Sequence, residues 1–244
     1  KEKYMYHTIL PLMNGSESGG RFSQILYGST DSGIVVLENL RESGFSSIND
    51  LVKDLTTCKL VFKTLAQFHA LSITRVNEQH MKELVFFNEI RTNSFGFDDK
   101  FDMVIFKKFV KFVVPALPED VRLNVTHAVH GFKDAHSLAY SIDENAFNVL
   151  IIGDPNRMNV FYQQDDEKKM PKECKFVDFQ MSRRGSPVID LVNYLLTSVE
   201  IEIVEKCSSE LFQCYLSELE RALQTLGEDT RNCYKYNPIC KMCI

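Results

Sequence analysis

The sequence predicts an α+β fold with a small β-rich beginning, a mainly helical body and one short strand hairpin inside that body. Two apolar runs within residues 23–40 flank a polar turn at 30–33, as in a β-hairpin. From Leu51 to His69, apolar side chains recur every three or four residues, as on one face of a helix. Residues 149–180 alternate short apolar strands with polar turns, and a charged loop marks the tip of this hairpin.

Three further helices are expected from start signals or apolar spacing. A weaker helical pattern covers residues 118–141, where a proline occupies the favourable first turn. The next helix has Ser186 as its N-cap and Pro187 in its first turn. The last runs from Glu202 and is expected to stop at Gly227. One face of this last helix carries Leu211, Tyr215, Leu219, Ala222 and Leu226.

Composition and charge narrow the classes of function. The chain has 244 residues, of which 44% are hydrophobic and 25% are charged, as in ordinary globular proteins. No run of about 18 apolar residues is present, so no membrane span is expected. A net charge of −5 without a Lys/Arg cluster argues against nucleic acid as a partner. Seven irregularly spaced cysteines favour reduced thiols and a cytoplasmic location, and nothing indicates an obligatory protein partner.

Three polar residues at strand ends form the candidate chemical site. Asp154 follows a buried strand, Asn159 opens the next strand, and Asp178 follows a third. Carboxylate and amide oxygens suit Mg²⁺ with a bound polyphosphate. The order Asp, four residues, Asn and then Asp-Phe is the spacing of protein-kinase-like phosphotransferases. The alternative interpretation is that all three are turn residues, because Asp and Asn are common in turns.

Four longer strings share their order and spacing with one kinase family: IIGDPNRMN, FVDFQMSRRGSPVIDLVNYLLTS, VVLENLRESGF and LVFKTLAQFHALSI. They resemble the insect ecdysteroid kinase-like family, also called CHK kinase-like, which is related to choline and aminoglycoside kinases. The resemblance covers nearly the whole chain and implies a protein-kinase-like fold. Residues 1–40 would be the remnant of the N-lobe, with the hinge at 37–40. Residues 41–244 would form the helical C-lobe, with a catalytic hairpin at 149–180.

The resemblance also implies roles for single residues. Asp154 would be the catalytic base that takes the proton of a substrate hydroxyl, and Asn159 and Asp178 would be Mg²⁺ ligands. Glu2, in a segment similar to the N-lobe helix, would pair with a phosphate-binding lysine. The hinge residues that would bind the adenine of ATP are Leu37, Glu38, Asn39 and Leu40. The implied function is ATP-dependent phosphate transfer to a small-molecule hydroxyl, that of an ecdysteroid or a similar lipophilic alcohol.

Several positions depart from the family's pattern. Ile152 stands where a histidine that braces the loop is usual, Asn39 replaces an Asp, and Asn156 replaces an aromatic residue. We expect cut ends, because the phosphate-binding lysine, the glycine-rich loop and further C-terminal helices are absent; the string GSESGG at 15–20 does not fit a phosphate loop. A second hypothesis therefore stays open: a non-catalytic pseudokinase or a truncated nucleotide- or ligand-binding protein.

Other conspicuous residues are interpreted as structural. His69 lies on an apolar helix face and is expected to be buried and hydrogen-bonded. Asp190 resembles an acid that anchors its helix beneath the catalytic loop. The single C-x2-C near the end lacks the second pair that a zinc site needs. Surface or packing roles are expected for His127, His130 and His136, and core positions for Cys58, Cys207 and Cys214.

Overall fold

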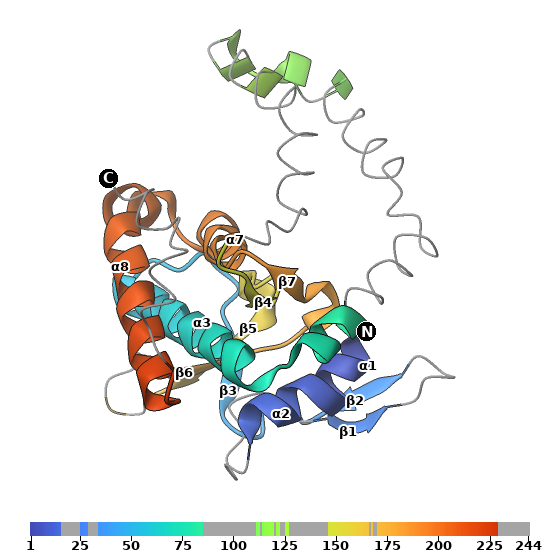
Figure 1. Cartoon of the computed structure of the whole chain (residues 1–244). Helices are drawn as coiled ribbons and strands as arrows, with labels where there is room; N and C mark the ends of the chain where they lie inside the picture. The colour runs from blue at the N-terminus through green and yellow to red at the C-terminus, as the bar shows by residue number, and fades with distance from the viewer. Residues whose placement is uncertain are drawn as a thin grey trace. The chain divides into compact units, whose positions relative to one another are not determined.

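The computed structural model (Figure 1) shows two compact units, one formed by residues 1–84 with 143–244 and the other by residues 85–142. All the candidate site residues belong to the first unit. The structure describes residues 1–15, 25–28, 34–84, 111–112, 114–119, 121–122, 125–126, 146–165, 167 and 170–228. Most of the helix expected at 118–141, its three histidines and the C-x2-C lie outside these residues. In the second unit, the short 3-10 helix η2 (Val114–Ala116) is described.

An unbroken helical segment begins the chain, as the resemblance implied. It consists of α1 (Glu2–Tyr4), the π-helical turn η1 (Met5–Ile9) and α2 (Leu10–Asn14). One side of the segment is buried in the core through Met5, Tyr6, Ile9, Leu10 and Met13. Beyond it, β1 (Ile25–Gly28) and β2 (Val35–Leu37) pair antiparallel, so the first predicted hairpin is confirmed.

The first long helix starts later than its apolar spacing predicted. α3 (Leu55–Arg75) begins after Asp54, whose side chain accepts the backbone N–H of Thr57 at 2.7 Å. Leu51, the expected first residue, is 37% exposed. Its neighbour Val52 forms a parallel bridge with Val199 instead. The apolar spacing of a helix thus extends by chance into the segment before Asp54, and the N-cap Asp54 marks where the helix begins.

The strands near the middle of the chain pair differently from the predicted hairpin. β5 (Val160–Gln164) and β6 (Pro171–Phe176) form the expected hairpin, and β3 (Phe45–Ser47) joins its free edge. However, β4 (Val149–Ile151) pairs with β7 (Arg183–Gly185) in a separate two-stranded sheet. The prediction that one hairpin spans 149–180 is therefore wrong for its first strand. No local pattern indicated β7, because arginine and glycine have little strand preference.

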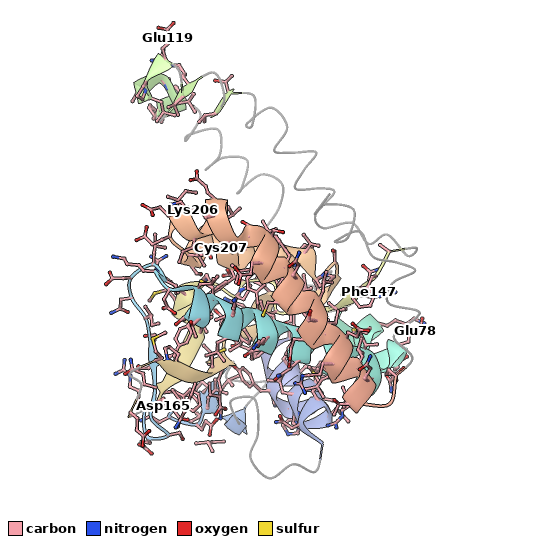
Figure 2. The ribbon with its side chains drawn as sticks, turned by 90° about the vertical axis from the view of Figure 1, so that its left-hand side faces the viewer. Glu78, Glu119, Phe147, Asp165, Lys206 and Cys207 are labelled. Carbon is pink, nitrogen blue, oxygen red and sulfur yellow. The ribbon has the colours of Figure 1, made fainter. Side chains whose placement is uncertain are left out.

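Two helices complete the first unit. α7 (Val188–Ser198) starts one residue later than expected, although Ser186 Oγ still accepts the N–H of Val188 at 3.4 Å. α8 (Ile201–Thr225) ends just before Gly227, as predicted, and lies along α3 (Figure 2). Its predicted face is buried through Leu211, Tyr215, Leu219 and Ala222. No helix in the described part of the chain is long and apolar enough to cross a lipid bilayer.

Candidate active site

The loop between β4 and β5 holds Asp154 and Asn159 close together. Asn156 accepts the N–H of Met158 at 2.8 Å and so caps the 3-10 turn η3 (Arg157–Asn159). Asn159 N–H donates to the carbonyl of Asn156 at 2.9 Å, and Asn159 Nδ2 donates to the carbonyl of Asp154 at 3.0 Å. Both predicted site residues are half-buried. The four-residue spacing therefore corresponds to a capped turn that closes on itself.

The third site residue lies beside them, across the β5–β6 ladder. The N–H of Val177 donates to the carbonyl of Asn159 at 3.0 Å. Asn159 lies just before β5 and Asp178 lies two residues after β6, so both are at the same end of this strand pair. Asp178 has φ 62° and ψ 69° and precedes the 3-10 turn η4 (Phe179–Met181). It is the one non-glycine residue with positive φ in the described part of the chain, a conformation that costs roughly 1–2 kcal/mol. The structure thus brings the three predicted residues to one end of the hairpin.

The N-terminal helical segment packs onto the turn that carries Asp178. Tyr6 OH accepts the N–H of Asp178 at 3.2 Å, and its ring meets that of Phe179 edge to face at 5.4 Å. Burial raises the pKa of the Tyr6 hydroxyl, so it stays a neutral partner. Burial and the nearby charge of Asp178 raise the pKa of the Glu2 carboxyl. Glu2 therefore lies near Asp178, where the resemblance expects an acid that pairs with a cation.

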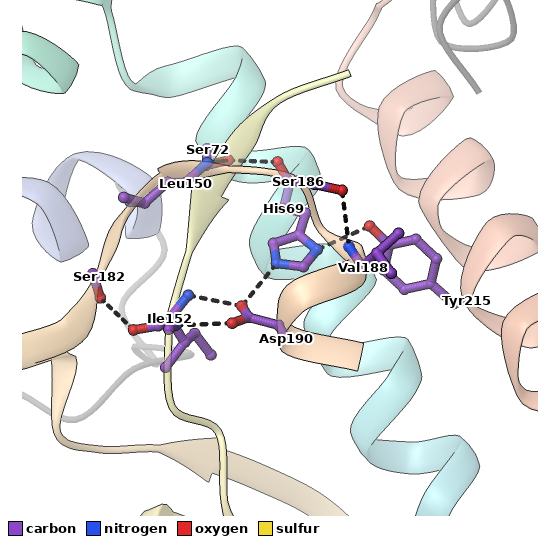
Figure 3. Close-up of polar contacts among 10 residues, drawn as sticks. His69, Ser72, Leu150, Ile152, Ser182, Ser186, Val188, Asp190 and Tyr215 are labelled. Atoms are coloured by element: carbon purple, nitrogen blue, oxygen red, sulfur yellow. Dashed lines mark hydrogen bonds and ion pairs between the residues drawn. The ribbon is translucent and has the colours of Figure 1, made fainter. Parts of the chain in front are cut away.

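A buried network fixes the start of the loop that carries Asp154 (Figure 3). Asp190 accepts the N–H groups of Ile152 and Gly153 at 2.7 and 2.8 Å. Its Oδ2 also lies 3.2 Å from His69 Nε2, while His69 Nδ1 lies 2.9 Å from Tyr215 OH. A neutral imidazole satisfies both bonds by donating from one nitrogen and accepting at the other. The structural interpretations of His69 and Asp190 are confirmed, and the network joins the loop to α3, α7 and α8.

Two serines add to this support, and sequence reasoning missed both. Ser72 Oγ accepts the N–H of Leu150 at 3.1 Å, and Ser182 Oγ donates to the carbonyl of Ile152 at 3.1 Å. Ile152 itself is fully buried, with both of its backbone polar groups bonded. The position that usually carries a histidine is therefore occupied here by an apolar side chain, and the hydrogen bonds run through its backbone.

The expected hinge follows β2 as a tight turn. Leu37 and Glu38 are half-buried, Asn39 is exposed and Leu40 is buried. The Asn39 side chain accepts the backbone N–H two residues later at 3.2 Å, as an Asx turn does. The N–H of Phe45 donates to the carbonyl of Leu40 at 3.0 Å. Asn39 therefore forms this turn through its side-chain oxygen, which an Asp side chain at the same position would also offer.

Comparison with known proteins places the chain in a family. A model of the ecdysteroid kinase-like family matches residues 1–228, which include all the site residues described above. The chain belongs to the ecdysteroid kinase-like family. A search of curated proteins finds no match. Family membership implies a kinase-like fold, and the mixture of helices with small antiparallel sheets is compatible with it. The assignment of lobes at 1–40 and 41–244 stays a prediction.

In this member of the ecdysteroid kinase-like family, an arginine gives the loop that carries Asp154 a second anchor. Arg157 Nη1 donates to the carbonyl of Thr197 at 2.7 Å, and its Nε donates to the carbonyl of Asn49 at 3.1 Å. Thr197 lies in the last turn of α7, where carbonyl groups lack helical partners and favour a cation. The sequence offered no signal for this contact, because the three residues are far apart along the chain.

The donor set fits a Mg²⁺ ion that is shared with a phosphate ligand. Within the described ranges, no group of three or more His, Cys, Asp or Glu side chains could hold a metal alone. Asp178 and Asn159 would supply one carboxylate and one amide oxygen, and Mg²⁺ typically takes one or two protein ligands and completes its shell with water and phosphate. The residue types at this end of the hairpin are therefore compatible with Mg²⁺, and a magnesium site here stays a prediction.

The raised pKa of Glu2 makes a testable contribution to stability. A carboxyl whose pKa rises on folding stabilises the fold at low pH, and this contribution is lost as pH rises above the ordinary value of 4.5. We expect Glu2→Gln to be more stable than the wild type at pH 7 and to lose this advantage at pH 4. Urea unfolding across this range measures it, with the exposed Glu205→Gln as control. If the free energies of unfolding of Glu2→Gln and the wild type differed equally at both pH values, burial and repulsion would not raise the pKa of Glu2.

Proposed function

We propose that this chain is an ATP-dependent small-molecule kinase that transfers a phosphate to a hydroxyl group, with an ecdysteroid or a similar lipophilic alcohol as the acceptor. The observation that carries the proposal is the placement of Asp154, Asn159 and Asp178 at one end of the β5–β6 hairpin, in a chain that matches the kinase-like family over residues 1–228. We also propose a cytoplasmic location and a free small molecule as the substrate.

In this proposal each residue has a separate task. Asp154 orients the attacking hydroxyl and takes its proton as the new oxygen–phosphorus bond forms and the bond to ADP breaks. Asn159 and Asp178 would hold Mg²⁺, which would neutralise the charge of the phosphates of bound ATP. The backbone of residues 37–40 binds adenine. Glu2 pairs with a cation that binds the phosphates near Asp178. Catalysis of this kind depends mainly on positioning, and the anchors at Asp190 and Arg157 supply it.

A second candidate is a protein that binds nucleotide without turnover. The observation in its favour is Ile152, whose buried apolar side chain offers no polar group where the family's histidine would support the metal-binding segment. Loss of that support weakens the placement of Asp178 without removing any reacting group. Binding and phosphate transfer must therefore be measured separately.

The test is thermal unfolding with and without Mg²⁺ and ATP, followed by an assay of phosphate transfer. At a hundred times its dissociation constant, a ligand adds about 2.7 kcal/mol, which should raise the unfolding midpoint by roughly 5–10 °C. We expect this rise to disappear in Asp178→Asn and to persist in the control Asp50→Asn, which changes an exposed acid of the same kind.

The variant Asp154→Asn and the wild-type turnover separate ATP binding from phosphate transfer and so distinguish the two candidates. If the chain is a kinase, this variant keeps the Mg²⁺-dependent rise but loses ATP turnover with hydroxyl acceptors by about two orders of magnitude or more. If the wild type binds ATP but transfers no phosphate to any acceptor in an alcohol panel, the non-catalytic candidate replaces the first. A folded wild type that shows no rise refutes both.

A further inference from the structure

A buried lysine lies on β6, between the hinge and the metal-binding turn. Lys175 is only 9% exposed, although lysine is rarely buried unless it is paired. Its neighbour Cys174 contacts Thr64 of α3, with Sγ and Oγ1 3.2 Å apart. Because successive side chains of a strand point to opposite faces, Lys175 points away from α3. Its charge must therefore find a partner on the other face of the sheet.

That partner is Glu38 in the predicted hinge segment 37–40. Lys175 Nζ lies 3.6 Å from Glu38 Oε1, and the side chains of the pair are 11% and 24% exposed. The same ammonium group lies 5.1 Å from the centre of the Phe45 ring, in the range of a cation–π contact. An ion pair so shielded from water is stronger than one on an open surface. Removing either partner leaves a charge with too little solvent around it.

The pair connects two segments that the proposed function needs to align. Glu38 belongs to the adenine-binding segment 37–40, and Lys175 comes three residues before the metal ligand Asp178. A second contact reinforces the link, since Gln163 Nε2 on β5 donates to the carbonyl of Ser43 at 2.9 Å. The hinge turn is thus attached to the strand hairpin that carries the metal-binding end.

We propose that Lys175 is a positioning residue that fixes the hinge relative to Asp178 and thereby sets the affinity for ATP. The inference rests on the proposed nucleotide site, and it assigns to Lys175 no contact with the nucleotide. Asp154 is held independently by the bonds of Asp190 to the loop, so the hinge pair should affect the binding of ATP more than the rate of transfer. The predicted signature is a higher KM for ATP with a nearly unchanged kcat.

The test compares variants that remove the charge but keep the side-chain volume. Lys175→Met retains the stem, Glu38→Gln neutralises the partner, and the double variant shows whether the two act as a pair. Lys175→Arg keeps the charge and should keep most of the wild-type affinity for ATP. Lys172→Met is the matched control, because Lys172 is exposed on the same strand. Glu38→Gln also covers the case in which Lys175→Met does not fold.

Two measurements are needed on each variant. Hydrogen exchange of residues 34–46 without nucleotide should be about fivefold faster in Lys175→Met, because the turn loses its anchor. The dissociation constant and KM for ATP should rise about tenfold, within the range by which residues outside a site change affinity. The double variant should match the single variants, and Lys172→Met should match the wild type.

The outcomes separate this inference from the proposed function. If the wild type binds ATP and Lys175→Met binds it equally well, the inference is overturned and the nucleotide site stands. Weaker ATP binding with unchanged exchange also overturns it, since Lys175 would then act on the nucleotide directly. A wild type that binds no ATP refutes the proposed function and, with it, the effect on affinity; faster exchange in Lys175→Met would still establish the mechanical link.

Discussion

Replacing Asp190 with alanine should destabilise the chain by about 3–5 kcal/mol, the usual effect of removing one partner from a buried charged network. The carboxylate is fully buried and accepts the N–H groups of Ile152 and Gly153 as well as a bond from His69. Alanine leaves these donors without an acceptor and creates a cavity among α3, α7 and β4. For a domain of this size the unfolding midpoint should fall by roughly 6–20 °C.

Two further variants show whether the destabilisation depends on the hydrogen bonds of Asp190 or would follow the loss of any acidic side chain. Asp190→Asn keeps the volume and one acceptor oxygen, so its destabilisation should be intermediate. Asp54→Ala removes an acid that accepts a single backbone N–H at the half-buried start of α3, and it should cost about 1 kcal/mol. If Asp190→Ala were no worse than Asp54→Ala in chemical denaturation, the network would not be what holds the loop.

Some features of this fold have local signals in the sequence. α8 was predicted closely, because its stripe from Leu211 to Ala222 repeats a helical period over about three turns and a glycine follows the helix. The local positions of Asp154, Asn159 and Asp178 were also predictable, because a capped turn and a strand end fix their spacing within short segments; their roles stay predictions. In each case the physical cause lies within a few residues of the signal.

Features that depend on distant segments gave no such signal. β7 consists of Arg183, Arg184 and Gly185, and it becomes a strand only because β4 pairs with it. The contacts of Arg157 with Thr197 and of Lys175 with Glu38 join residues from separate elements through long side chains. Long polar side chains have no periodic pattern that indicates their partners. These anchoring contacts therefore had no signal in the sequence, although the candidate site residues did.

Gly153→Ala should damage both stability and turnover, because this position joins the buried strand β4 to Asp154 under two constraints. Gly153 has φ +92°, which an L residue adopts only with strain. A Cβ at this position would also lie 2.4 Å from the carbonyl oxygen of Met181 and 2.8 Å from its carbonyl carbon. Backbone cannot swing away as a flexible side chain can, so either β4 or the turn after Asp178 must move.

A matched glycine separates the two causes. Gly227 has φ +83° and nothing within 4 Å of a built Cβ, so Gly227→Ala should show only the backbone strain, about 1–2 kcal/mol. Gly153→Ala should add a steric term of about 1–3 kcal/mol to a similar strain. Equal destabilisation of the two variants in chemical denaturation would mean that the contact with Met181 relaxes freely.

The effect of Gly153→Ala on function follows from what the clash displaces. Met181 ends the 3-10 turn that Asp178 begins, and Gly153 immediately precedes Asp154. A shift of about 1 Å between these two segments separates the proposed base from the proposed metal ligand, which can reduce phosphate transfer about a hundredfold. Turnover that stays near the wild-type value in a destabilised Gly153→Ala would show that the two acids do not need this fixed separation, and the roles assigned to them would have to be revised.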